Sequence, residues 1–141
     1  MSSQVMQWPR LLGPEEQEVL ELTRRLLDAI AERDWEEYCQ LCDEGLTSFE
    51  PEARGCLVEG LAFHQFYFDT RIAEVYGRST ICAPFVRMLG RDVALVAYVR
   101  ITQRVKPDGT VASDRFEETR VWQRQADGGW RHVHFHRSAH G

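Results

Sequence analysis

Hydrophobic and polar residues alternate along two stretches near the C-terminus, Phe116–Arg124 and Trp130–Ser138. A period of two residues is typical of β-strands that are buried on one face only. Residues 126–129 between the two stretches read Ala-Asp-Gly-Gly, which is the composition of a tight turn. The pattern therefore predicts an antiparallel hairpin.

The faces of this hairpin place arginines among apolar and aromatic side chains. One face of the first strand carries Phe116, Glu118, Arg120 and Trp122. The second strand carries Val133, Phe135 and Arg137 on one face, and on the other Trp130, His132, His134 and His136. An unpartnered guanidinium is costly in such surroundings. We therefore expect Arg120 and Arg137 to face an anion, either a protein carboxylate or a bound acid.

Two further strands are predicted before the hairpin. The first is Thr80–Leu89, in which Pro84 marks an edge or a bulge because proline cannot donate to the ladder. The second is Val93–Lys106, which carries on one face Ala94, Val96, Tyr98, Arg100 and Thr102. With turns at residues 90–92 and 107–109, these segments predict an antiparallel meander.

Helical periodicity dominates the N-terminal half. From Pro14 onward the apolar residues Val19, Leu22, Leu26 and Ile30 share one side, which predicts an amphipathic helix packed on a sheet. A short helix is expected over 35–42, followed by brief strands at 46–49 and 55–58.

A third helix is predicted to begin after Gly60. Its sequence, Leu61–Phe68, is so aromatic that we expect it to be largely buried. Helices first and strands afterwards indicate an α+β fold with the helices on one sheet face. Residues 1–13 are interpreted as a leader or linker, and residues 14–141 as the domain.

Charge and composition exclude several classes of function. The chain has 141 residues and a formal net charge of −5, which argues against a general nucleic-acid binder. It contains neither a run of apolar residues long enough to span a membrane nor a signal peptide. We therefore expect one cytoplasmic domain.

Metal binding has only weak support in the sequence. Cys39 and Cys42 form a C-x-x-C inside an expected helix, without a second pair for zinc, so the four cysteines are interpreted as reduced, buried residues. His132, His134 and His136 would span too much of a strand for all three to bind one ion, although two of them could meet. Surface or subunit-contact histidines are the favoured interpretation, with no metal and no cofactor.

Five segments carry a family resemblance. They are Phe49–Ala53, Leu57–Phe68, Ala97–Gln103, Glu117–Trp122 and Val133–Ser138. In this order they resemble the association (hub) domain of calcium/calmodulin-dependent protein kinase II, over about Glu15 to Ser138. The resemblance implies an NTF2-like cone, in which a long helix and shorter ones are cradled by a curved antiparallel sheet.

The resemblance also implies a function. Such domains are non-catalytic and assemble into stacked rings, commonly dodecamers or tetradecamers, that hold kinase domains close together. The expected partners are therefore further copies of the chain and a kinase domain on the same or a partner chain. This sequence has no kinase motifs of its own: it lacks a glycine-rich phosphate loop, H-R-D and D-F-G.

A polar pocket is the second implication of the resemblance. Family members line it with three arginines, and in brain forms it accepts small carboxylates such as γ-hydroxybutyrate analogues. The matching positions are Arg100, Arg120 and Arg137, with His64 and Tyr38 at the pocket histidine and tyrosine. Glu118 is the nearest obvious counter-charge, and a purely structural network in which Glu118 and other acids neutralise the arginines is the alternative.

An enzyme is the competing function. The NTF2-like cone also hosts isomerases and dehydratases with an acid or base in the cup, for which His64 or Glu118 would be the candidate. A carboxylate beside arginines is a weak base, and the fold alone does not establish catalysis.

The departures from the family pattern include Ala83-Pro84-Phe85, where Asn-Pro-His is usual, and they leave the ring contacts and the subunit number open.

Overall fold

The computed structural model describes residues 3–6, 11–70 and 76–139. Its sheet has the strand order β1-β4-β5-β6-β7-β2-β3. The strands are β1 Gln4–Met6, β2 Cys42–Phe49, β3 Val58–Glu59, β4 Tyr76–Met88, β5 Val93–Val105, β6 Val111–Arg124 and β7 Trp130–Ala139. The pairs β4–β5, β5–β6 and β6–β7 are antiparallel, which confirms the predicted meander. The sheet as a whole is mixed rather than antiparallel, because β1 runs parallel to β4 and β2 runs parallel to β7.

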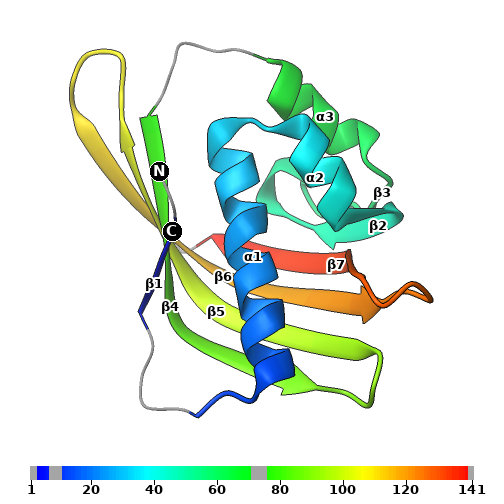
Figure 1. Ribbon diagram of the computed structural model, residues 1–141. Coiled ribbons are helices and arrows are strands. Elements are labelled where there is room, and N and C mark those ends of the chain that lie inside the picture. The colour runs from blue at the N-terminus through cyan, green and yellow to red at the C-terminus, as the bar shows by residue number, and fades with distance from the viewer. Residues whose placement is uncertain (1–2, 7–10, 71–75, 140–141) are drawn as a thin grey trace.

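The helix α1, Pro14–Glu32, lies across the hollow of the curved sheet, as Figure 1 shows. The Glu16 side chain accepts a hydrogen bond from the Gly13 N–H at its start, and Arg33 in a left-handed conformation ends it. The short α2, Trp35–Leu41, is capped by Asp34, whose carboxylate accepts from the Glu37 N–H at 3.1 Å. A single 3₁₀ turn, Pro51–Ala53, and α3, Ala62–Asp69, complete the helical side of the α+β fold.

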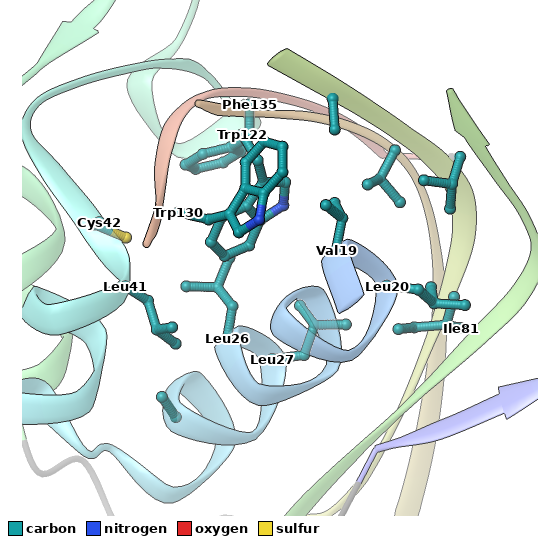
Figure 2. Packing of buried hydrophobic residues seen from close by; sticks show 14 of the residues in the cluster. Val19, Leu20, Leu26, Leu27, Leu41, Cys42, Ile81, Trp122, Trp130 and Phe135 are labelled. Carbon is teal, nitrogen blue, oxygen red and sulfur yellow. The ribbon is translucent and has the colours of Figure 1, made fainter. Parts of the chain in front are cut away.

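The core lies between α1 and the sheet. Figure 2 shows Leu26 and Val19 of α1 facing the indole of Trp122, with Trp130 and Phe135 beside them. Trp122 is fully buried, and its Nε1–H donates to the Thr23 hydroxyl of α1 at 3.1 Å. This bond satisfies the polar atom that a buried tryptophan carries.

Two bulges change which residues face the core. In β4 the register shifts between Cys82 and Phe85, where Ala83 has a φ of 48°; this confirms the bulge expected at Pro84. The second bulge is in β7. Trp122 of β6 pairs with His132 and the preceding Val121 pairs with His134, so Val133 of β7 is an extra residue. As a result His132 and Phe135 are both buried, and the prediction that they lie on opposite faces was wrong.

Within residues 1–13, the strand β1 pairs with β4 and extends the edge of the sheet. One other expectation needs correction. The helix α3 is much less buried than its aromatic sequence suggested: Phe66 is 64% and Tyr67 is 45% exposed, while His64 is its buried residue. Among the described residues, no helix is both long and apolar enough to cross a membrane.

Candidate ligand pocket

Neighbouring strands bring the charged residues into one row across the sheet. Tyr98 of β5 pairs with Glu118 of β6, which in turn pairs with Arg137 of β7. Arg100 follows Tyr98 by two residues in β5, and Arg120 follows Glu118 by two residues in β6, so each shares a face with the residue that it follows. The alternation that the sequence showed therefore places all five side chains on the concave side of the sheet.

Glu118 holds the two buried arginines. Its carboxylate accepts from Tyr98 Oη–H at 2.5 Å, from Arg120 Nη2 at 3.0 Å and from Arg100 Nη1 at 3.1 Å. Burial by itself would raise the pKa of Glu118, but the guanidiniums of Arg120 and Arg100 outweigh burial and hold this pKa well below its usual range. Glu118 is therefore an anionic structural partner and a poor proton acceptor.

The guanidinium of Arg120 donates its hydrogen bonds to buried protein groups. Its Nε donates to Tyr98 Oη at 2.8 Å, and its Nη1 lies 3.4 Å from His132 Nε2. Its guanidinium also stacks over the Phe135 ring, 4.6 Å from the centroid. Burial would lower the pKa of Arg120, but the Tyr98 and Glu118 oxygens overcome this effect and raise it. Burial, reinforced by Arg120, lowers the pKa of His132 well below normal, so His132 is neutral at physiological pH.

A cavity of about 230 Å³ opens beside this network. Its walls come from α1, α2, the 3₁₀ turn, α3 and the last two strands, and are formed by Ile30, Tyr38, Glu50, Glu52, His64, Tyr67, Phe68, Arg120, Phe135 and Arg137. Half of these side chains are aromatic or aliphatic, and the two glutamates lie beside Arg137.

Arg137 forms ion pairs with two glutamates that the sequence analysis did not include in the site. Its Nη2 pairs with Glu52 and lies 4.0 Å from Glu50 Oε1. The other Glu50 oxygen accepts from Ser48 Oγ at 2.7 Å and lies 2.8 Å from His64 Nε2. Burial would raise the pKa of Glu50, but the interactions with His64, Ser48 and Arg137 together outweigh burial and lower this pKa. Since Glu50 is ionised, His64 Nε2 is the donor in that bond.

The structure therefore divides the predicted site residues. Tyr38, His64, Arg120 and Arg137 line the cavity. Arg100 and Glu118 do not line it; Arg100 donates to Ser79 and Glu118 behind the cavity wall. Glu118 was the nearest counter-charge that the sequence offered, and among the described residues Glu50 and Glu52 also pair with these arginines, as the alternative of a structural network requires.

Glu50 and Glu52 had a signal in the sequence. They belong to Phe49–Ala53, one of the segments that carry the family resemblance. What the sequence did not reveal is that β2 runs parallel to β7, which brings these glutamates beside Arg137.

The three histidines do not form a joint site. The bulge places His132 in the core, where its Nδ1 lies 3.5 Å from Cys42 Sγ. His134 lies on the other face and its Nδ1 is 2.7 Å from Thr47 Oγ1. Within the described residues, no group of three metal-binding side chains comes together. Cys42 is buried as expected, whereas Cys56 is exposed and corrects the expectation that all cysteines are buried.

The fold, a long helix in the hollow of a curved sheet with a pocket at one end, is that of the NTF2-like class. An NTF2-like protein from Salmonella enterica, 23% identical, superposes with a TM-score of 0.71 over 89% of this chain and 91% of its own. That likeness shows the fold alone.

The particular family follows from closer relatives. The model of the calcium/calmodulin dependent protein kinase II association domain matches residues 15–141, and the chain belongs to this family. The delta subunit of calcium/calmodulin-dependent protein kinase type II from Oryctolagus cuniculus is 46% identical over 124 residues, which are 86% of this chain but 23% of the relative. The chain thus spans about a quarter of that kinase.

Solved structures agree with this assignment. The CaMKII hub homology domain of Chlamydomonas reinhardtii is 43% identical with a TM-score of 0.85, covering 92% of this chain and 100% of that one. The association domain of C. elegans CaMKII is 44% identical with a TM-score of 0.80, covering 88% and 95%. Membership confirms the resemblance seen in the sequence and the expectation of a non-catalytic domain.

Proposed function

We propose that this domain is an oligomerisation hub that assembles copies of itself into stacked rings. The observation that carries the proposal is the family match over residues 15–141, which covers all three helices and the strands from β2 onward. Exposed apolar side chains on the described surface, including Phe66, Tyr67 and Leu57, are consistent with burial in an assembly.

The mass of the particle in solution tests the hub. Size exclusion with light scattering, checked by native mass spectrometry, is expected to give a multiple of 16.4 kDa corresponding to many subunits. A dodecamer or a tetradecamer would set the ring size. A monomer or dimer across a wide concentration range would contradict the hub proposal and leave a small-molecule-binding NTF2-like protein as the better interpretation.

We also propose that the hub holds kinase domains near one another, carried on the same or a partner chain. Its support is that the rabbit relative, which contains a matching segment, is a kinase. Recovery of the native particle with an antibody to this domain, followed by a calmodulin-dependent phosphorylation assay, tests it. A recovered particle without kinase activity would contradict it.

The cavity is proposed to bind small monocarboxylates. Its support is an arginine, Arg137, at a cavity of a suitable size that aromatic and aliphatic side chains also line, with His64 nearby. An arginine fork grips a carboxylate through two parallel hydrogen bonds. Butanoate is expected to raise the melting temperature of the wild type and not that of Arg137→Ala.

The matched control for this test is Arg104→Ala. Arg104 is also a strand arginine paired with a carboxylate, Asp114, but the pair is solvent-exposed and outside the cavity. The control should keep the butanoate response. An equal response in the wild type and Arg137→Ala would contradict the proposed pocket.

A further inference from the structure

Arg137 already carries a carboxylate at the position where a ligand would bind. Its Nη2 donates to Glu52 Oε2, and Glu50 Oε1 lies on the same nitrogen at 4.0 Å. Among the arginines of the network, Arg137 is the one whose side chain retains appreciable exposure, 17%, compared with 8% for Arg100 and 1% for Arg120. A ligand carboxylate that enters the cavity would therefore contact Arg137, whose guanidinium is already paired with Glu52.

The two glutamates on Arg137 are not equivalent. The Glu50 side chain is 3% exposed and is fixed on its second oxygen by the Ser48 hydroxyl and by His64. The Glu52 side chain is 35% exposed, and among the described residues its one ion-pair and hydrogen-bond partner is Arg137. It also stands on a single 3₁₀ turn, Pro51–Ala53, whose side chains can reach water without unfolding an element.

Charge decides what can happen when an acid binds. A third carboxylate added to Glu50 and Glu52 would leave one guanidinium facing three negative charges, and like charges at such distances repel strongly away from bulk water. Displacement of Glu50 would break its bonds to Ser48 and His64 and bury an unpaired histidine donor. Displacement of Glu52 breaks one partly exposed ion pair, which is a small loss.

We propose that Glu52 is an internal competitor: it stands in for the ligand's carboxylate on Arg137, and an acid binds by taking its place. The inference rests on the proposed carboxylate pocket. Displacement of Glu52 sets the affinity and also the charge specificity, because the retained Glu50 leaves room for one incoming negative charge. Monocarboxylates are therefore accepted and dicarboxylates of similar size are excluded.

Titration of the intact protein with butanoate, followed calorimetrically, tests the proposal. Glu52→Gln keeps the shape and removes the charge, so we expect it to bind butanoate about tenfold more tightly than the wild type, the usual scale for one charge-assisted contact. Glu59→Gln is the matched control, since Glu59 is an exposed glutamate on β3 outside the cavity and its replacement changes the net charge equally. It should leave the affinity unchanged.

A second variant separates competition at Arg137 from a general effect on the turn. In an Arg137→Ala background, Glu52→Gln should no longer increase the affinity, because the group for which both carboxylates compete is gone. An increase that persists there would overturn the proposal. Succinate gives the specificity readout, and binding as tight as that of butanoate to the wild type would also contradict the displacement of Glu52 alone.

The outcomes distinguish this inference from the pocket proposal. Wild-type binding of butanoate that Glu52→Gln does not strengthen overturns the competitor and leaves the pocket intact. Binding seen in Glu52→Gln and absent from the wild type supports both. No binding by either protein, with both folded by circular dichroism, overturns the pocket and the competitor with it.

Discussion

Replacement of Glu118 by glutamine should destabilise the protein strongly, although the two side chains have the same shape. Glu118 is 2% exposed and contacts Arg100 and Arg120, both buried, at 3.1 and 3.0 Å. Two unit charges about 4 Å apart attract by about 4 kcal/mol at an effective dielectric constant near 20. Desolvation offsets part of this attraction, but the replacement leaves two guanidiniums buried without a counter-charge. Breaking one side of a buried ion pair typically costs about 3–5 kcal/mol, and we expect a loss in that range.

Urea unfolding at neutral pH measures this loss. The protein concentration must be fixed, because assembly stabilises the folded state by mass action. Glu59→Gln is the control and should change the free energy of unfolding by less than about 0.5 kcal/mol, as exposed substitutions do. A loss below about 1 kcal/mol for Glu118→Gln would refute the argument that Glu118 is the charge on which the two arginines depend.

The pH dependence of the stability difference between the wild type and Glu118→Gln is an independent test of the Glu118 charge. The pKa of Glu118 is depressed in the folded state, so its contribution is fully present above the unfolded-state pKa of about 4.3 and is lost as the pH falls toward the folded-state pKa. The wild type should therefore exceed Glu118→Gln by a constant amount from neutral pH down to about pH 5. Below that range the difference should shrink. A difference that vanished by about pH 6 would contradict the depressed pKa.

The remaining predictions concern the core and the thiols. Thr23→Val removes the acceptor of Trp122 Nε1–H and leaves that donor buried, so the free energy of unfolding in urea should fall by about 1–3 kcal/mol; an unchanged value would mean that water replaces the hydroxyl. Cys56 is exposed and should react with iodoacetamide in the folded protein. Burial raises the pKa of Cys42 to about 12, so Cys42 should react only after unfolding, as peptide mass mapping would show. Rapid labelling of Cys42 in the native protein would contradict its place in the core.

Most of the meander could be predicted because its chemistry is local. Period-two alternation in β5 and β6 continues without interruption, so Arg100, Glu118 and Arg120 were assigned to the correct faces. Proline at position 84 likewise signalled the bulge in β4. The helix α1 combined a proline start, acidic residues in its first turn and a continuous apolar stripe, and its bounds follow from those features.

The errors have non-local causes. The extra residue in β7 has no marker such as glycine or proline, and it is the pairing with β6 that moves His132 into the core. The pairing of β2 with β7 joins segments more than eighty residues apart, and it alone brings Glu50 and Glu52 to Arg137. For α3, aromatic content was taken as a measure of burial, although Phe66 and Tyr67 lie on its exposed side. Composition alone cannot distinguish an aromatic side chain that is buried in the domain from one that is exposed on its surface.

The three arginines and three glutamates form two groups of opposite sign, and this arrangement explains why an acid would exchange rather than add. Arg100, Arg120 and Glu118 form an inner group with one excess positive charge. Arg137 with Glu50 and Glu52 forms an outer group in which two carboxylates face one guanidinium. The groups are close enough for Arg137 to lower the pKa of Glu118, so the whole network is balanced before any ligand arrives. Exchange of the Glu52 carboxylate for a ligand's carboxylate preserves that balance, whereas simple addition would bury an uncompensated charge. The arginines that were expected to face either a protein carboxylate or a bound acid therefore already face protein carboxylates, and in the proposed exchange a ligand would replace the one that is held least firmly.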